Sequence, residues 1–257
     1  MSSVQPFLQV RGIAKRYSNI EALKAIDLDL YTGEVLAIVG DNGAGKSTII
    51  KILSGAITPD SGEIIIAGRK YSKLKPKTAL DAGISTVYQD LALIDTMDSA
   101  SNIFLGREHR KHFFCLDDKR MQQEALDLLQ QLGIYIPSLY STVACLSGGQ
   151  RQGVAVARAI HQGGRLLIFD EPTAAMGLKE TATVLRLIRG LAEEGFGVIV
   201  VSHNMEQVFK ISDRICIMRQ GEVVDCVKTS EVNPQDVVAM ITGAIDLEDF
   251  SIYRSKN

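Results

Sequence analysis

The chain has 257 residues, of which 46% are hydrophobic and 23% charged, and its 28 Lys plus Arg against 30 Asp plus Glu give a formal net charge of −2. These values are typical of a globular protein with one large domain or two small ones, and they exclude a disordered chain. Because a protein that holds nucleic acid through its phosphates needs a basic excess or a basic face, we expect no nucleic-acid partner.

Neither a membrane span nor an export signal is predicted. The longest apolar runs, such as residues 35–39 and 198–201, are far shorter than the roughly 20 residues that cross a bilayer. Residues 1–9 are polar and lack a basic region followed by an apolar stretch, so we expect the protein in the cytosol. The four cysteines form no CxxC pair, which favours reduced, packed thiols over a metal site.

Strand and helix patterns alternate along the chain. Short β-branched and apolar runs predict strands at residues 7–10, 35–39, 63–66, 84–88, 166–169, 198–201, 215–218 and 223–226. Apolar residues at helical spacing predict helices at residues 46–54, 121–132, 150–162, 179–194 and 205–211. This alternation predicts an α/β fold with a core at about residues 7–90 and 163–227. We expect a mostly helical lobe with short loops at residues 91–162, and a polar tail with an amphipathic patch at residues 228–257.

Residues 40–47 read GDNGAGKS and match the phosphate-loop pattern G-x-x-x-x-G-K-[ST] between a predicted strand and a predicted helix. Glycines let the backbone curl around an anion, Lys46 adds a charge for the β- and γ-phosphates, and Ser47 offers a hydroxyl to Mg²⁺. A glycine-rich turn without a ligand is the alternative, but motif, strand and helix all agree with the phosphate loop. The expected nucleotide contacts here are Gly40, Asn42, Gly43, Ala44, Gly45, Lys46, Ser47 and Thr48.

Residues 166–171 read LLIFDE, an apolar strand that ends in two acids. Asp170 is placed to hold the shell of a Mg²⁺ ion, directly or through water, and Glu171 to polarise an attacking water as a general base. Two solvated acids at a strand end are common in isolation, and it is the phosphate loop that favours the catalytic interpretation. The two motifs predict a nucleoside-triphosphate site, which kinases, GTPases, motors and transporters share.

Residues 146–150 read LSGGQ and start a predicted helix just before the acidic strand. Ser147, Gly148, Gly149 and Gln150 can form a second phosphate-binding turn at the amino end of that helix. One nucleotide cannot use two distant loops of one chain, but it can lie between one loop from each of two chains. We therefore expect a dimer that sandwiches ATP.

With these motifs, residues 7–227 resemble the ATP-binding subunits of ABC transporters. Residues 146–150 resemble the family signature, residues 40–47 its Walker A motif, and residues 166–171 its Walker B motif with the catalytic Glu171. The resemblance implies a P-loop NTPase fold: an ABC ATPase cassette with a RecA-like α/β core, an N-terminal antiparallel β part and an inserted helical lobe, in one domain over residues 1–257. ATP and Mg²⁺ are the implied ligands.

The resemblance also assigns three residues that are weak indicators one by one. Tyr17 is implied to stack on adenine, Gln89 to sense Mg²⁺ and the γ-phosphate and to link to the permease, and His203 to act as the switch histidine. A π-face, an amide oxygen and a neutral imidazole suit these roles, although each residue type alone is more often packing, solvated or structural. The expected catalytic residues are therefore Glu171, His203 and Lys46, and the expected Mg²⁺ ligands are Ser47, Gln89 and Asp170.

One stretch departs from the family pattern. Where the family usually carries Ser-Ala-Leu-Asp after the Walker B motif, residues 174–177 read AAMG, which puts the role of that Asp across the dimer interface in doubt. This variant is similar to the ATP-binding subunits of monosaccharide importers of the ribose, xylose and fructose type. Asp41, Asn42 and residues 102–108 (NIFLGRE) share the similarity, which is greatest to single-domain fructose-import subunits.

The resemblance implies an ATP-hydrolysing subunit that energises import of a monosaccharide through separate membrane permease subunits, with an extracytoplasmic sugar-binding protein as an indirect partner. We expect it at the cytoplasmic face of the cell membrane, as a homodimer or paired with another ATPase chain, docking through residues near 89–108. Open alternatives are a transporter of another substrate, a soluble ABC-type ATPase of DNA repair or translation, and a small-molecule kinase. The soluble ATPases typically carry a long coiled coil or two cassettes, and a kinase leaves residues 146–150 unexplained.

Overall fold

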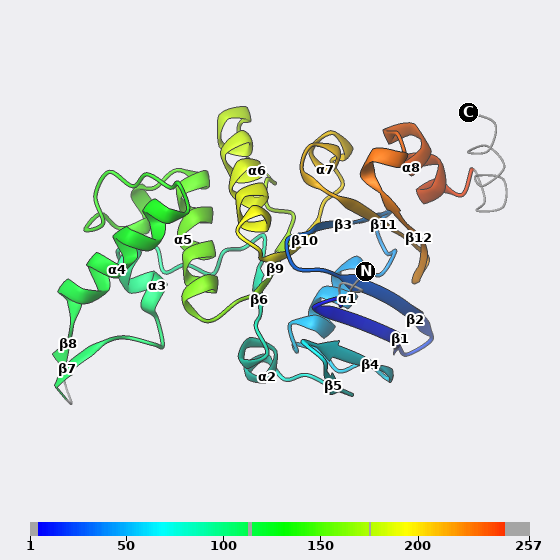
Figure 1. The fold of residues 1–257 in the computed structure, drawn as a ribbon, viewed down its shortest axis with the longest axis horizontal. Coiled ribbons are helices and arrows are strands. Elements are labelled where there is room, and N and C mark those ends of the chain that lie inside the picture. The colour runs from blue at the N-terminus through cyan, green and yellow to red at the C-terminus, as the bar shows by residue number, and fades with distance from the viewer. Residues whose placement is uncertain (1–4, 113–114, 175, 245–257) are drawn as a thin grey trace.

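The computed structural model describes residues 5–112, 115–174 and 176–244, whose arrangement Figure 1 shows. An antiparallel sheet has the order β2-β1-β4-β5 and consists of β1 (Leu8–Tyr17), β2 (Ile20–Leu30), β4 (Ser61–Ile66) and β5 (Arg69–Tyr71). A six-stranded sheet has the order β12-β11-β3-β10-β9-β6 and consists of β3 (Val35–Gly40), β6 (Ile84–Val87), β9 (Leu166–Asp170), β10 (Gly197–Val201), β11 (Arg214–Arg219) and β12 (Glu222–Lys228). Its strands are parallel except for β12 at one edge.

Helices cover both faces of the six-stranded sheet. On one face α1 (Lys46–Leu53) lies between the two sheets, and α2 (Pro76–Asp81) precedes β6. The other face is covered by α6 (Leu178–Glu193), α7 (Met205–Ile211) and α8 (Pro234–Thr242). Beside β6, a lobe consists of α3 (Ser99–Phe104), α4 (Asp118–Gln131), α5 (Gly148–His161) and a hairpin of β7 (Arg110–His112) and β8 (Cys115–Leu116). Short 3-10 helices span Val143–Cys145 and Thr229–Glu231.

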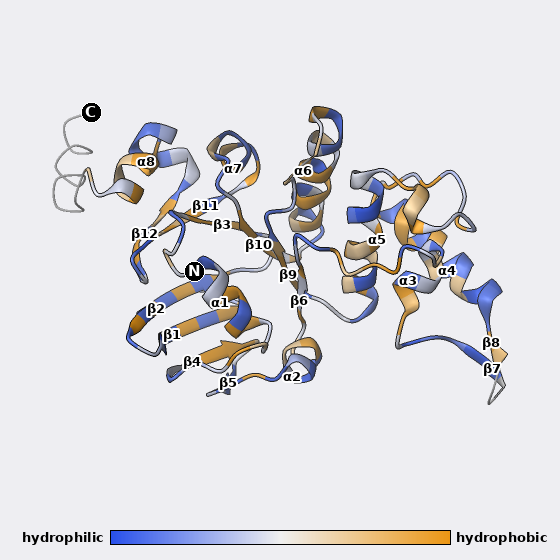
Figure 2. Ribbon diagram, turned by 180° about the vertical axis from the view of Figure 1, so that it is seen from behind, coloured by the Kyte–Doolittle hydropathy of each residue, from blue (hydrophilic) through white to orange (hydrophobic). Residues whose placement is uncertain are grey.

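The central strands are buried on both faces. Leu36 and Ile38 of β3 pack with α1 and the antiparallel sheet, because successive side chains of a strand point to opposite faces. Val35, Ala37 and Val39 pack on the other side with the helices. Figure 2 shows β3, β9 and β10 as largely hydrophobic ribbons, as expected of strands covered on both faces.

The predicted strands and helices are all present, which confirms the α/β fold class. The sequence pattern does not predict β2, because its apolar residues alternate with Lys24, Asp27 and Asp29 and its ladder to β1 shifts register. Ala25 interrupts the alternation with a φ of 50°. The α2 and α3 helices were missed because six residues are too few to show a helical period.

The expectation of short loops in the lobe is wrong. Residues 132–147 connect α4 to α5 with only a short 3-10 helix, and the β7–β8 hairpin lies between α3 and α4. The segment before α3 is irregular as well, and a buried polar side chain holds it in place of regular backbone pairing. The Asn102 Oδ1 accepts a bond from the amide of Ile94 at 2.8 Å, and its Nδ2 donates to the carbonyl of Asp98 at 3.0 Å.

The predicted polar tail contains a packed helix. Val237, Met240 and Ile241 of α8 are buried against Ile215 and Ile217 of β11. Residues 245–257, the end of the predicted tail, lie outside the described residues. Among the helices that the structure describes, none combines the length and the apolar character needed to cross a bilayer.

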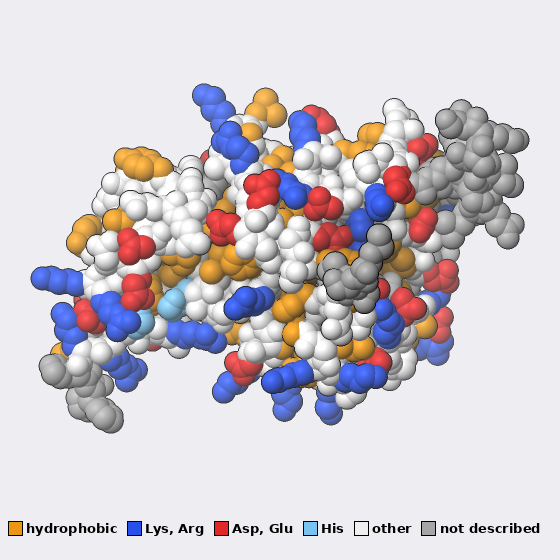
Figure 3. Space-filling model, in the orientation of Figure 1, with side chains coloured by type: hydrophobic (Ala, Val, Ile, Leu, Met, Phe, Trp, Pro, Cys, Tyr) orange, Lys and Arg blue, Asp and Glu red, His pale blue; other side chains and the backbone are white. Residues whose placement is uncertain are grey.

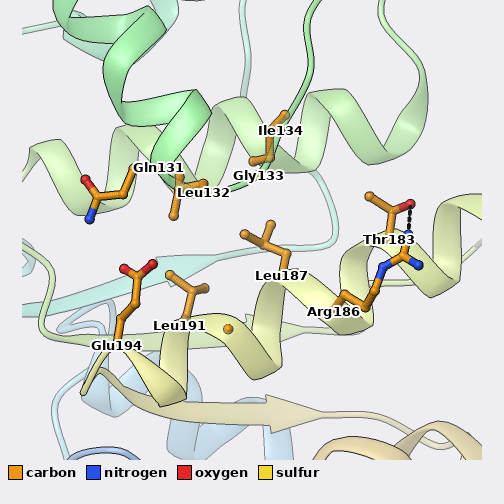
Figure 4. A pocket seen from close by; sticks show the side chains of 10 residues that line it. Gln131, Leu132, Gly133, Ile134, Thr183, Arg186, Leu187, Leu191 and Glu194 are labelled. Atoms are coloured by element: carbon orange, nitrogen blue, oxygen red, sulfur yellow. Dashed lines mark hydrogen bonds between the residues drawn. The ribbon is translucent and has the colours of Figure 1, made fainter.

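A cavity of about 330 Å³ marks the seam between the lobe and α6 (Figure 4). Ile134 lines it from the lobe, and Leu187 and Gly190 line it from α6. A Cβ built on Gly190 would meet nothing within 4 Å, whereas a Cβ on Gly153 of α5 would lie 2.4 Å from the Cδ1 of Ile134. A side chain therefore has room at Gly190 but not at Gly153.

Substitution of these glycines by alanine should change stability in opposite directions. Gly190→Ala gains helix propensity in open space and should raise the free energy of unfolding by about 0.5–1 kcal/mol. Gly153→Ala makes the same gain but collides with Ile134, and overpacking costs about 1–3 kcal/mol, so a net loss is expected. Urea denaturation measures both, and adding Ile134→Val should recover part of the loss at Gly153. Equal gains at the two positions would contradict the close contact.

Candidate functional site

Four loops that carry predicted site residues meet at one edge of the six-stranded sheet. The parallel register pairs Val201 of β10 with Ile38 of β3 and with Asp170 of β9, and β6 runs beside β9 in the same direction. The carboxyl ends of these strands therefore share an edge, which is where open α/β sheets bind their ligands. The phosphate loop follows β3, Glu171 follows β9, Gln89 lies after β6 and His203 after β10.

The phosphate loop has a backbone shape that only glycine permits at two positions. Gly40 has a φ of 153°, and a Cβ there would lie 2.2 Å from the carbonyl oxygen of Met218. Gly45 has a φ of 104°, and a Cβ there would lie 2.7 Å from the carbonyl oxygen of Ala22. Strands β11 and β2 thus hold the loop by backbone contact, and any side chain at either glycine would displace it.

Lys46 lies over the loop at the start of α1. Its ammonium donates to the carbonyls of Gly40 at 2.6 Å and Asp41 at 2.9 Å. Burial lowers the pKa of Lys46 below its ordinary value, although the carboxylates of Glu171 and Asp170 act in the opposite direction. The N-cap of α1 is a glycine with no side-chain cap, so no side chain covers the amides of Lys46 and Ser47, which can meet an anion, whereas the amide of Thr48 donates to the carbonyl of Gly45 at 3.0 Å.

The two acids and the histidine form a compact group next to the loop. The Nδ1 of His203 lies 2.9 Å from the Oε1 of Glu171, and the amide of Glu171 donates to the carbonyl of Val201 at 2.9 Å. Glu171 has a φ of 51°, a left-handed conformation that is uncommon for a residue with a side chain. Burial, and then repulsion by Glu171, raises the pKa of Asp170 above its ordinary value, against the attraction of Lys46.

The donor set at this edge suits Mg²⁺. The Ser47 hydroxyl, the Gln89 amide and the Asp170 carboxylate all offer oxygen, which hard cations prefer. Burial first, and repulsion by Glu171 second, raise the pKa of Asp170, and a bound divalent cation would offset both effects. These residues therefore fit the ion that the sequence leads us to expect.

The LSGGQ turn is well formed but lies in the lobe. Ser147 caps α5, its amide donates to the Oε1 of Gln150 at 2.9 Å, and the amide of Gln150 donates back to the Ser147 Oγ at 3.4 Å. The amide of Gly148 donates to the Oε1 of Glu180 at 3.0 Å. Figure 1 shows α5 beyond β6 and α6 as seen from α1, so one chain does not bring this turn to its own phosphate loop.

Tyr17 and Gln89 are both exposed, so each is accessible to a ligand. Tyr17 ends β1 with 44% of its surface exposed, and the Lys15 ammonium lies 5.7 Å from its ring centre. Gln89 lies just after β6, at the start of the segment that leads into α3. Of the AAMG stretch, Ala175 lies outside the described residues, while Gly177 is exposed at the N-cap of α6.

Two arginines that sequence reasoning missed join the segment after Gln89 to the LSGGQ helix. Arg158 donates to the carbonyls of Leu91 at 2.7 Å and Ala92 at 2.8 Å. Arg151 pairs with Asp95 at 2.6 Å. Both arginines lie on α5, seven positions apart in the sequence and so on one helix face, which is the one signal that could have singled them out. Side-chain contacts therefore join the segment at residues 91–95 to α5.

Charges are mixed around these elements. On the face shown in Figure 3, Lys and Arg side chains are interspersed with Asp and Glu over the core. Such a surface carries no large field of one sign on this side of the molecule.

Known proteins match this chain along most of its length. A sequence profile described as ABC transporter matches residues 23–174. The chain is 47% identical to the fructose import ATP-binding protein of Rhizobium meliloti, over 93% of this chain and 95% of that protein. It is 41% identical to the xylose/arabinose import ATP-binding protein of Sulfolobus acidocaldarius, over 91% and 93% of the two chains. The ribose import ATP-binding protein of Yersinia pestis is 40% identical over 93% of this chain, which spans 46% of that protein.

Solved structures have the same fold. A nucleotide-free ATP-binding cassette from an ABC transporter superposes with a TM-score of 0.79 at 20% identity, over 97% of this chain and 99% of that one. A dimeric ATP-binding cassette in a post-hydrolysis state, bound to ADP and Pi, superposes with a TM-score of 0.72 at 27% identity, over 86% and 98%. The matched profile and the identities above 40% together establish that the chain belongs to the ABC transporter family.

Proposed function

We propose that this chain is an ATP-hydrolysing subunit that energises the import of a monosaccharide, with fructose as the first candidate, through a separate membrane permease. The observation that carries the proposal is the gathering of the phosphate loop, Glu171 and His203 at one sheet edge, in a chain that also carries the LSGGQ helix. The names of the fructose, xylose/arabinose and ribose relatives support a sugar as the transported substrate.

Two copies complete the nucleotide site. Because the LSGGQ turn lies apart from the phosphate loop of its own chain, a nucleotide that contacts both needs a second chain. A two-fold pairing places each phosphate loop against Ser147 and Gly149 of the other copy, and this closes two like sites. A relative at 27% identity that is described as dimeric and bound to ADP and Pi supports this pairing.

Within each site, the loop amides and Lys46 hold the β- and γ-phosphates, and the ring of Tyr17 stacks on the base. Ser47, Gln89 and Asp170 would hold a Mg²⁺ ion, which would neutralise phosphate charge when bound. These contacts position the γ-phosphoryl group for attack from the side of the acidic strand.

Glu171 orients the attacking water and accepts its proton. Because a carboxylate only accepts, the Nδ1 of His203 donates to Glu171, and its Nε2 donates to an oxygen of the transferred group when both ring nitrogens carry a proton. Lys46 stabilises the charge that develops on that group. The strained backbone of Glu171, held by the carbonyl of Val201, fixes the carboxylate at the strand end.

Hydrolysis changes the contact across the dimer. The γ-phosphate is a ligand of the closed dimer only before hydrolysis, so its release shifts the population to the open form. Arg158 and Arg151 tie residues 91–95 to α5, so closure displaces that segment with the LSGGQ helix. Residues 89–108 receive a permease element at the cytoplasmic face of the membrane, and an extracytoplasmic sugar-binding protein delivers the sugar on the other side.

Glu171→Gln should abolish turnover and preserve ATP binding. The amide keeps the size of the side chain but cannot accept the proton of water, so the rate of ATP hydrolysis should fall at least about 100-fold. An ATP-bound dimer should accumulate, which size-exclusion chromatography detects. Glu194→Gln, which neutralises an exposed carboxylate at the end of α6, is the matched control and should behave as wild type. Undiminished hydrolysis by Glu171→Gln would overturn the role of Glu171.

Sugar should stimulate hydrolysis in the assembled transporter. In liposomes that contain this chain and its permease, ATP hydrolysis should rise severalfold when the sugar-binding protein and fructose are added together, and less with ribose or xylose. Either addition alone is the control, because the binding protein signals to the permease only when it carries sugar. Stimulation by a peptide, a metal ion or a lipid and by none of the three sugars would contradict the sugar assignment.

A further inference from the structure

One carboxylate joins the amino ends of two long helices. The Oε1 of Glu180 accepts the amide of Gly148, the first residue of α5, at 3.0 Å. Its Oε2 accepts the amide of Gly177, the N-cap residue of α6, at 3.4 Å. Both helix dipoles place partial positive charge here, so the carboxylate is favoured by two helices at once.

The first turns of the two helices lie within van der Waals contact of each other. A Cβ on Gly148 would lie 3.5 Å from the Oε2 of Glu180, and a Cβ on Gly149 would lie 3.8 Å from the backbone oxygen of Glu180. The first turn of the LSGGQ helix thus packs directly on the first turn of α6. The bridge links residues 32 positions apart, one in the lobe and one in the core.

At Gly177, the contact with Glu180 is joined along the chain to Glu171 by a segment that contains two turns. The amide of Ala174 donates to the carbonyl of Glu171 at 3.2 Å, and the amide of Met176 donates to the carbonyl of Thr173 at 3.3 Å. Glu171 and Gly177 are six positions apart in the sequence, so only a short segment separates the bridge at Gly177 from Glu171.

We propose that Glu180 is a positioning residue that couples the two ATP sites of the dimer. The inference rests on the proposed function, in which the LSGGQ turn of a chain contacts the ATP held by its partner, while Glu171 of the same chain acts on the ATP held by that chain. Engagement of one ATP by Gly148 and its neighbours then sets Glu171 at the other ATP. Gly177 carries no side chain, so in this chain the carboxylate at this point comes from Glu180.

If Glu180 were only a helix cap, its substitution would have the same effect as substitution of another capping carboxylate. The chain offers such a carboxylate as a matched control. Asp236 occupies the same capping position in α8, where its Oδ2 accepts the amide of Asn233 at 3.1 Å. The amide of Asp236 donates in turn to the Oδ1 of Asn233 at 3.0 Å, so both of these hydrogen bonds lie within the first turn of α8. Loss of the Asp236 carboxylate therefore removes a helix cap without breaking a contact between two helices.

The test compares Glu180→Gln with Asp236→Asn in ATP hydrolysis measured against ATP concentration. The wild-type dimer should give a Hill coefficient approaching two, the number of sites. Glutamine keeps the size of the side chain but has one acceptor oxygen for two amides, so Glu180→Gln should lower the Hill coefficient to about one and kcat about tenfold. The affinity of the isolated subunit for ATP, measured by fluorescence titration, should change less than twofold, and Asp236→Asn should match the wild type throughout.

Hydrogen exchange gives a second measurement on the same variants. The amide of Gly148 should exchange faster in Glu180→Gln, and thermal melting checks that the fold is retained. A wild type that hydrolyses ATP without cooperativity, or a Glu180→Gln variant that keeps the wild-type Hill coefficient and kcat, overturns the coupling role and leaves the proposed function intact. A wild type with no ATP hydrolysis overturns the proposed function itself.

Discussion

Backbone carbonyls of β11 and β2 lie against the phosphate loop, and the shape of the loop depends on these contacts. The carbonyl of Met218 leaves no room for a side chain at Gly40, and the carbonyl of Ala22 leaves none at Gly45. The amide of Gly221, in the turn after β11, donates to another loop carbonyl at 3.1 Å. A loop held in this way has little freedom left to lose when it binds a phosphate, which is the advantage of preorganisation.

The parallel sheet fixes the positions of the other site residues as well. Because β3, β10 and β9 are paired in register, the phosphate loop, His203 and Glu171 are all fixed relative to one hydrogen-bonded frame. Outside the glycines of the loop, Glu171 has an uncommon backbone conformation, and the surrounding strands hold its φ of 51°. Strain of this kind, held by its neighbours, is typical of residues that must point in a single direction. The lobe carries the LSGGQ turn outside this frame and joins it through side-chain bridges.

The sequence predicts those parts of the molecule that depend on local pattern. The apolar runs of β3, β9 and β10 are continuous because both faces are buried, and the phosphate loop is a local motif whose glycines are adjacent to the contacts they serve. β2 was missed because half of its residues face solvent. The bridges from Glu180 to Gly148 and from Arg158 to the carbonyl of Leu91 were missed for a different reason. They join residues 32 and 67 positions apart, and no local pattern indicates which distant backbone group a charged side chain will meet.

The central claim is that each ATP lies between two chains, and mixed dimers test it most directly. Lys46→Ala removes the phosphate-loop charge, and Ser147→Arg blocks the LSGGQ turn, so either variant alone should be inactive. Equimolar mixing should raise hydrolysis above that of either variant alone, to at most about a quarter of the wild-type rate, because random pairing makes half of the dimers mixed and each of these has one intact site, whose rate the loss of coupling lowers further. Absence of any recovery, with mixed dimers demonstrated by differential tagging, would show that each site lies within one chain and would contradict the account.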